Sequence, residues 1–241
     1  MQIKTKAIVL TSLKFGEADL IVKCLTEEGM KSYLLRSILK AKSKKLKPGY
    51  FQPLSQIDIS AVHNNKGNLN SIREVRVAHM YQTIASNIYK QSIALFLAEV
   101  LANALREEER NPTMFSYIQT SLIWLDENKD FTNFHLVFLV GLTKYLGIAP
   151  DVKNKTANYF DLEEGYFTDI KPVRNYVAGQ ELILFRLLIG TKFDDMLGLK
   201  WSSGDRQAML EVLLLYFEFH LPGFKKPRSL KVLKEVFNEI S

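Results

Sequence analysis

The sequence is poor in the residues that build disulfides and metal centres. Its 241 residues include one cysteine, Cys24, and four histidines, and it has no C-x-x-C or H-E-x-x-H pattern. A single cysteine cannot form an intramolecular disulfide, so we expect Cys24, which lies in a strand-like stretch, to act as a small core hydrophobe. We predict no bound metal and no other cofactor.

Long apolar runs are also missing. The longest, at residues 136–140 and 182–185, are far shorter than the roughly 20 residues that span a bilayer. Residues 1–6 lead directly into strand-like sequence and not into the apolar region of a signal peptide. We expect a cytoplasmic protein without a membrane partner.

Catalytic patterns are absent as well. Gly190-Thr191-Lys192 resembles the end of a phosphate-binding loop, but the earlier glycine of that motif is missing and a helix is predicted where a strand should precede it. The acidic pairs fall in predicted turns, where solvation explains them. We predict that the protein is not an enzyme and has no small-molecule substrate.

Positive charge is concentrated in the first third of the chain. Residues 1–75 hold thirteen Lys/Arg against six Asp/Glu, while residues 76–241 hold nineteen against twenty. The formal charge of +6 therefore divides into +7 and −1. Such a local excess steers a polyanion toward one face of a protein.

The centre of this charge is the basic segment, residues 31–47, which has seven bases and no acid. Cations with aromatic rings nearby are typical of surfaces that hold a nucleic-acid backbone and unstacked bases. A solvated loop that aids solubility is the alternative. The candidate DNA-binding residues are Lys31, Arg36, Lys40, Lys42, Lys44, Lys45 and Lys47, with the rings of Tyr33, Tyr50 and Phe51.

Five short strand patterns occupy the N-terminal part, at residues 3–15, 20–26, 30–38, 54–62 and 69–77. The first alternates, which places Ala7, Val9, Thr11, Leu13 and Phe15 on one side. Five strands in about 75 residues fit the OB-fold barrel, which commonly binds single strands, and an SH3-like barrel fits nearly as well.

Helical periodicity replaces alternation near residue 79. Helices are predicted at about 81–109 (one bent or two), 112–124, 132–146, 179–190, 205–220 and 229–239. We therefore predict an α+β protein with two domains, an OB-fold at 1–78 and an all-α helical bundle at 79–241. A polar insert at about 151–175, with Tyr159, Phe160, Tyr166 and Phe167, resembles a hairpin that packs on the bundle.

Four fragments, in this order, resemble the RecO family of bacterial recombination mediators. They are G-E-A-D-L-I-V at 16–22 with T-E-E-G at 26–29, K-A-K-S at 40–43, K-Y-L-G-I-A-P-D at 144–151, and H-L-P-G-F at 220–224 with R-S-L-K-V-L at 228–233. The resemblance covers the whole chain. It departs from the family at the insert, where a four-cysteine zinc module is common, because the ligands are missing here.

The resemblance implies a function that composition alone does not. Members bind single- and double-stranded DNA, anneal complementary strands, contact the acidic C-terminal tail of single-stranded DNA-binding protein, and with RecR help load RecA. We expect that tail to bind at a site formed by Arg206, Leu213, Phe217, Lys225, Lys226 and Arg228. The lysines also fit the solvent-exposed face of an ordinary surface helix. An RNA-binding OB protein and a protein adaptor for an acidic partner remain alternatives.

Overall fold

The computed structural model describes residues 2–40, 46–64, 69–105 and 110–238. The chain divides into two compact units, Met1–Glu127 and Asn128–Ser241. The first unit contains the strands β1 (Gln2–Phe15), β2 (Asp19–Thr26), β3 (Gly29–Leu35), β4 (Gln56–Val62) and β5 (Ser71–His79), a short 3-10 helix (Pro48–Phe51), and the helices α1 (Ile88–Ala104) and α2 (Pro112–Glu127).

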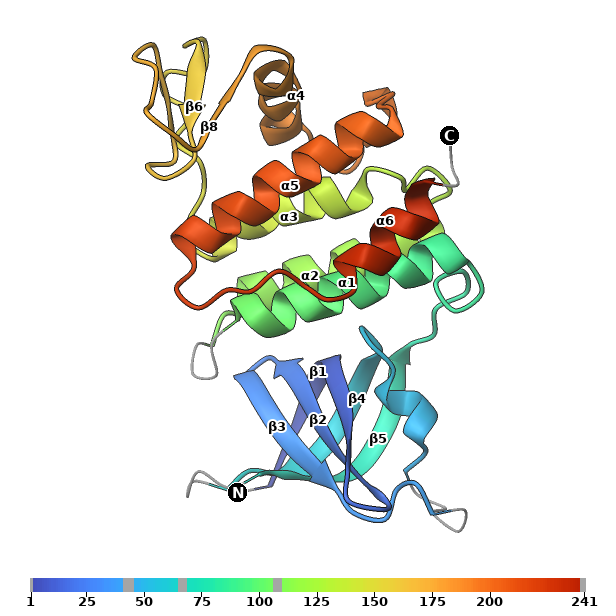
Figure 1. Cartoon of the computed structure of the whole chain (residues 1–241). Coiled ribbons are helices and arrows are strands. Elements are labelled where there is room, and N and C mark those ends of the chain that lie inside the picture. Colours follow the sequence, from blue (N-terminus) through green and yellow to red (C-terminus); the bar gives the residue numbers. More distant parts are fainter. Residues whose placement is uncertain (1, 41–45, 65–68, 106–109, 239–241) are drawn as a thin grey trace. The chain divides into compact units, whose positions relative to one another are not determined.

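The five strands form one antiparallel sheet in the order β3-β2-β1-β4-β5 (Figure 1). Its two edges meet at one point, where Tyr33 and Asn70 form a parallel bridge. Leu34 N–H donates to Asn70 O at 2.9 Å, and Asn70 N–H donates to Ser32 O at 3.0 Å. A curled five-stranded sheet that closes only in part is the architecture of the OB-fold. The predicted fold class, an OB-type barrel followed by helices, is confirmed.

A bulge in β1 changes which of its side chains face the core. Val9 pairs with Cys24 but Thr11 pairs with Lys23, so Leu10 is an extra residue on the β1 side. Because strand side chains alternate, one extra residue moves all later ones to the opposite face. Leu13 and Phe15 were expected on the same side as Ala7 and Val9, and that expectation was wrong: they are 64% and 51% exposed.

The barrel core is built from the inward-facing residues of all five strands. It includes Ala7 and Val9 of β1 and Val22 and Cys24 of β2, and it extends to Ile38, which follows β3. Burial raises the pKa of the Cys24 thiol to about 12, which keeps it protonated and unreactive. Cys24 is thus the core hydrophobe that the sequence predicted.

A buried carboxylate fastens the connection between β5 and α1. Asp126, near the end of α2, accepts the backbone N–H groups of Gln82, Thr83 and Ile84 at 2.8, 2.8 and 2.9 Å. Lys90 of α1 donates to the main-chain O of Asp126 at 2.9 Å and to Thr83 Oγ1 at 2.6 Å. This network holds residues 81–87, which were predicted to be helical, in a non-helical path. The helix α1 begins only at Ile88, after the N-cap Asn87.

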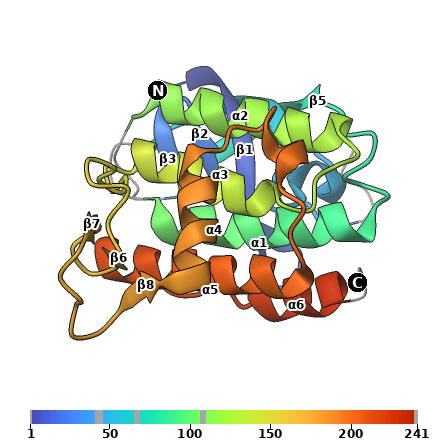
Figure 2. The ribbon, with the colours of Figure 1, turned by 90° about the horizontal axis from the view of Figure 1, so that it is seen from above.

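The second unit contains α3 (Phe134–Tyr145), α4 (Gly179–Gly190), α5 (Ser203–His220) and α6 (Leu230–Asn238), with a 3-10 turn at Met196–Gly198. A three-stranded sheet, β6 (Tyr159–Asp161), β7 (Tyr166–Thr168) and β8 (Tyr176–Ala178), has the order β7-β6-β8. Figure 2 shows it beside α4 and one end of α5. The predicted hairpin in the insert corresponds to β6 and β7. The prediction of an all-α second part missed β8.

The packing divides the chain at residue 127, whereas the sequence prediction placed a domain boundary after residue 78. That predicted boundary coincides with the change from strands to helices between β5 and α1. The helices α1 and α2 nevertheless group with the sheet, because α1 packs against β1 and Gln56 of β4 donates to Gln119 O of α2 at 3.2 Å. No helix in the described parts of the chain is both long and apolar enough to cross a membrane.

Candidate nucleic-acid interface

The described cations of the basic segment lie on several parts of the barrel. Lys31 lies on β3 and lowers the pKa of His63, after the larger effect of burial. Arg36 and Lys40 are exposed beyond the other end of β3, and Lys47 is exposed where the described chain resumes. Lys42, Lys44 and Lys45 lie outside the described residues. The four described cations therefore do not form one compact patch.

Two of the three rings proposed for base contacts are in the core. Tyr33 and Phe51 are 0% and 1% exposed, and Tyr33 pairs with His63 Nε2 through its hydroxyl at 3.0 Å. A buried ring cannot stack on a base, so the expectation for these two residues is corrected. Tyr50 is half-buried against the same core.

The outer face of β1, β2 and β3 carries apolar side chains that the sequence analysis did not select. Leu13 pairs with Ile21, and Ile21 pairs with Leu34, which places the three in one row across the strands. Phe15 lies two residues beyond Leu13 on the same face. We call Leu13, Phe15, Ile21 and Leu34 the outer strip. Only the bulge at Leu10 brings Leu13 and Phe15 to this face, and one strand's sequence does not reveal a bulge.

Residues 36–40 of the basic segment lie against the turn that joins β1 to β2, beside the outer strip. Leu39 N–H donates to Ala18 O at 2.9 Å, and Ser37 N–H donates to the Asp19 carboxylate at 2.7 Å. These bonds hold Arg36 and Lys40 near the end of the β1–β2 hairpin. Cations and exposed apolar groups, which are far apart in sequence, therefore meet at this end of the barrel.

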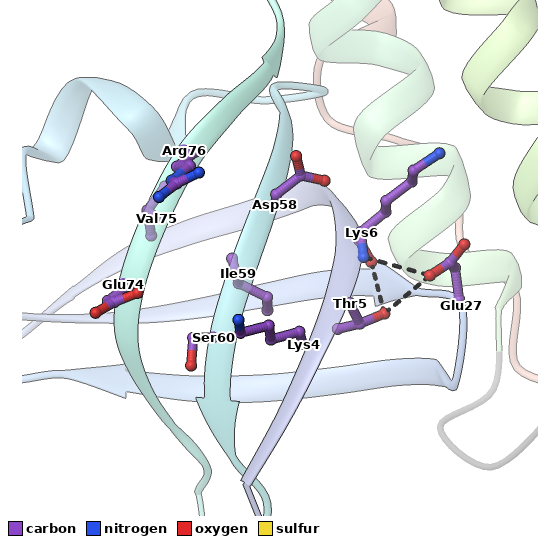
Figure 3. A pocket seen from close by; sticks show the side chains of 10 residues that line it. All are labelled: Lys4, Thr5, Lys6, Glu27, Asp58, Ile59, Ser60, Glu74, Val75 and Arg76. Atoms are coloured by element: carbon purple, nitrogen blue, oxygen red, sulfur yellow. Dashed lines mark hydrogen bonds between the residues drawn. The ribbon is translucent and has the colours of Figure 1, made fainter.

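A hollow on the outer side of β1, β4 and β5 is balanced in charge (Figure 3). Its volume is about 370 Å³. The Glu27 carboxylate accepts the backbone N–H of Lys6 at 3.4 Å there. Since this hollow carries as many acids as bases, it adds little to the attraction of a polyanion. Its charged lining residues are Lys4, Lys6, Arg76, Glu27, Asp58 and Glu74.

The residues predicted to hold a partner peptide are mostly inaccessible. Leu213 and Phe217 are 1% and 0% exposed, and Arg206 is 8% exposed. Arg206 Nη1 donates to Trp201 O at 2.6 Å, and burial lowers the pKa of this guanidinium, against a smaller opposite effect of Asp205. Phe217 packs on Phe224, with ring centroids 5.5 Å apart. The predicted apolar slot is thus filled by the protein's own side chains, and that part of the prediction is corrected.

The lysines and Arg228 of the predicted peptide site are accessible, and one of them, Lys226, lines a different groove. Lys225, Lys226 and Arg228 are exposed, and Lys226 forms an ion pair with Glu218 at 3.3 Å. The groove, of about 560 Å³, lies along α5 between β8 and α6 and has apolar and charged lining. We call it the α5 groove. Its apolar lining includes Val177, Val212, Leu215 and Leu230, and its charged lining residues are Lys226, Lys234, Glu181 and Glu211.

The insert has an aromatic core in the segment where the sequence resemblance implied a zinc module without its ligands. Phe160 is 0% exposed and its ring lies 4.8 Å from that of Phe167 and 4.7 Å from that of Phe185 on α4. The insert contains no cysteine or histidine, and no group of three His, Cys, Asp or Glu gathers among the described residues. The residues present therefore do not fit a zinc ion. Tyr159 is half-buried and Tyr166 is 43% exposed, so they contribute less than expected.

The fold and this surface define a class: a two-part α+β protein with an N-terminal OB-type barrel, cations on its strand ends, and a helical C-terminal part. The family models described as Recombination protein O N terminal and Recombination protein O C terminal match residues 1–81 and 85–230. The chain belongs to the RecO family.

Relatives cover almost the full chain. "DNA repair protein RecO" of Flavobacterium psychrophilum is 43% identical over 239 residues, which is 99% of this chain and 100% of the relative. The protein of the same name from Flavobacterium johnsoniae is 44% identical with the same coverage. That from Porphyromonas gingivalis is 30% identical over 245 residues, with 99% and 100% covered.

Proposed function

We propose that this protein acts in DNA repair as a DNA-binding recombination mediator. It binds single- and double-stranded DNA, anneals complementary strands, and with RecR helps load RecA onto DNA coated with single-stranded DNA-binding protein. The observation that carries the DNA-binding part is the excess of seven positive charges in residues 1–75, with Arg36 and Lys40 exposed on the barrel. Family membership supports the remaining parts.

The mechanism we propose is charge neutralisation. Two DNA strands repel each other, and cations that neutralise their phosphates let them approach closely enough to pair. Contacts to phosphates fix position without reading sequence, so we expect little sequence preference. Binding and annealing break no covalent bond, so this role needs no catalytic residues.

Recruitment to coated DNA requires a contact with the acidic tail, for which the α5 groove offers a new candidate. An acidic peptide that ends in an apolar side chain needs an apolar slot and nearby cations. Val212 and Leu215 of α5 line the groove, and Lys226 lies at its border. Tail binding should therefore depend on Lys225, Lys226 and Arg228, and not on Arg206.

Salt dependence of DNA binding tests the phosphate contacts. If about five phosphates of a single strand are neutralised, log K falls with log salt at a slope near −3.5. Replacement of Lys42, Lys44 and Lys45 by alanine should make that slope shallower by about two. The matched control replaces three exposed lysines of the second unit, Lys129, Lys171 and Lys192. It changes the net charge equally and should leave the slope unchanged.

Annealing of strands pre-coated with single-stranded DNA-binding protein tests the proposed function as a whole. The wild-type protein should accelerate annealing, and the basic-segment triple variant should not. An RNA-binding role would instead appear as preference for RNA over a matched DNA oligonucleotide in competition. A protein adaptor would retain no DNA at modest salt. Either result would refute the proposal.

A further inference from the structure

We propose that the outer strip binds unstacked bases of a single strand, with Phe15 as the stacking ring. This inference rests on the proposed function and deepens it, because it assigns base contacts to residues outside the basic segment. It replaces Tyr33 and Phe51, whose rings are in the core, with a ring that is 51% exposed.

The geometry of the strip comes from strand register. Leu13, Ile21 and Leu34 lie on three adjacent strands, and neighbouring strands are about 4.8 Å apart, so the row is about 10 Å long. Leu13 is 64% exposed, and Ile21 and Leu34 are half-buried. Phe15 continues the strip toward the end of the hairpin. Register thus places four apolar side chains on one face of the sheet, with a ring at one end.

Cations flank this surface on both sides. Lys23 pairs with Thr11 in the next row of the same outer face, and Arg36 follows the end of β3 on the other side, exposed to solvent. Of the nearby bases, Lys23 lies on the outer face and Arg36 and Lys40 follow the end of β3. Lys14 and Lys31 pair with the core residues Leu20 and Cys24 and therefore belong to the other face. Asp19 pairs with Phe15 and accepts the N–H of Ser37 at 2.7 Å. Beside the strip, the three cations Lys23, Arg36 and Lys40 therefore face two acids, Glu17 and Asp19, which leaves a small excess of positive charge.

This combination fits a single-stranded nucleic acid. An apolar strip alone fits many partners, but a strip bordered by cations complements a chain whose bases are flat and apolar and whose backbone is negative. A duplex hides its base faces in the stack and offers the strip only its phosphates. The outer strip should therefore contribute to the binding of single strands and not of duplexes.

The test compares Phe15→Ala with Phe15→Tyr, which keeps a ring, on the full-length protein. The probes are a labelled oligothymidine and a hairpin-capped duplex of matched length, measured by fluorescence anisotropy at one salt concentration. Loss of one stacked base should weaken single-strand binding by about 5- to 150-fold. Duplex binding should stay within about twofold, and Phe15→Tyr should bind like the wild type. The salt slope of Phe15→Ala should not change, because no cation is removed.

Four results separate the interpretations. Single-strand binding by Phe15→Ala at the wild-type level would overturn the inference and leave the proposed function intact. An equal loss on both probes would also overturn it, since the ring would then act on phosphate contacts or on folding. Loss of binding to a protein partner, with DNA binding unchanged, would assign the strip to a protein interface instead. Absence of DNA binding by the wild type would refute the proposed function itself. A urea midpoint within error of the wild type confirms that Phe15→Ala is folded.

Discussion

Replacement of Asp126 by alanine should destabilise the first unit more than any surface change. The Asp126 side chain is 2% exposed and accepts three backbone N–H groups within 2.9 Å, as well as the Thr83 hydroxyl at 3.2 Å. Without the carboxylate, these donors lose their partner in a buried place. The connection between β5 and α1 would then have lost the group that fixes its path.

The magnitude follows from the number of donors. An unsatisfied buried donor costs about 1 to 3 kcal/mol, and removal of one partner of a buried charged network typically costs about 3 to 5 kcal/mol. We expect the free energy of unfolding to fall by about 3 to 5 kcal/mol, because water and small backbone shifts give some of the three N–H groups a new partner. Since whole domains are stable by about 5 to 15 kcal/mol, the variant should be close to unfolding at elevated temperature.

The assay is urea unfolding followed by circular dichroism. With a slope of about 1 to 3 kcal/mol per molar urea, the midpoint of Asp126→Ala should fall by at least about 1 M. The matched control is Glu127→Ala, at the exposed neighbouring position of the same helix, which should change the free energy of unfolding by less than about 0.5 kcal/mol. Equal midpoints for the two variants would refute the reasoning.

The pH dependence gives an independent test of the same carboxylate. Burial raises the pKa of Asp126, but the N–H groups of Gln82, Ile84 and Thr83 and the Thr83 hydroxyl lower it further, so it lies below the ordinary value of 3.8. A carboxyl group whose pKa is lowered by folding stabilises the protein above its unfolded pKa, and this contribution disappears as the pH falls through the folded value. The difference in stability between the wild type and Asp126→Asn should be constant above about pH 5 and shrink below about pH 4.

Three further predictions concern the second unit. Chelators should leave its melting temperature unchanged, and stoichiometric zinc that is lost together with stability would contradict this. Phe160→Ala should cost about 3 to 5 kcal/mol because it empties the aromatic core of the insert, whereas Tyr166→Ala, at a 43% exposed site, should cost less than about 0.5 kcal/mol. Arg206→Ala should lower stability by about 1 to 3 kcal/mol, through its lost bond to Trp201 O. Unchanged stability with abolished binding of a tail peptide would show that Arg206 is a contact residue after all.

Alternation in the sequence was enough to predict the five strands but not the faces of all their residues. The ranges of β1, β2 and β4 agree with the prediction within two residues, because apolar residues at every second position indicate a sheet with one buried side. The bulge at Leu10 depends on how β1 pairs with β2, which is a property of two strands together. Leu13 and Phe15 were therefore placed on the wrong side, and the outer strip was missed.

For other residues the necessary signal was in the sequence. Arg206, Met209, Leu210 and Leu213 have the spacing of one helix face, and all four are buried. Tyr33 is two residues before Leu35, so strand alternation places both on the core side, as the structure does. Arg206 and Tyr33 were predicted to bind a partner because of their residue types, a cation for a carboxylate and a ring for a base, and this led to the errors. The periodicity of the helix and of the strand already placed them on the buried face.

The insert shows how such a small sheet remains stable without metal ligands. A sheet of three strands, each of three residues, cannot hold its shape alone, because small sheets need a hydrophobic face packed on another element. Here Phe160 of β6 contacts Phe185 of α4 and Tyr216 of α5, with ring centroids 4.7 and 6.0 Å apart. Tyr216 in turn donates its hydroxyl to Ile148 O at 2.8 Å. Zinc would tie the strands to one another, whereas these contacts tie them to the helices. The stability of the insert is therefore coupled to that of α4 and α5, which also form or border the α5 groove.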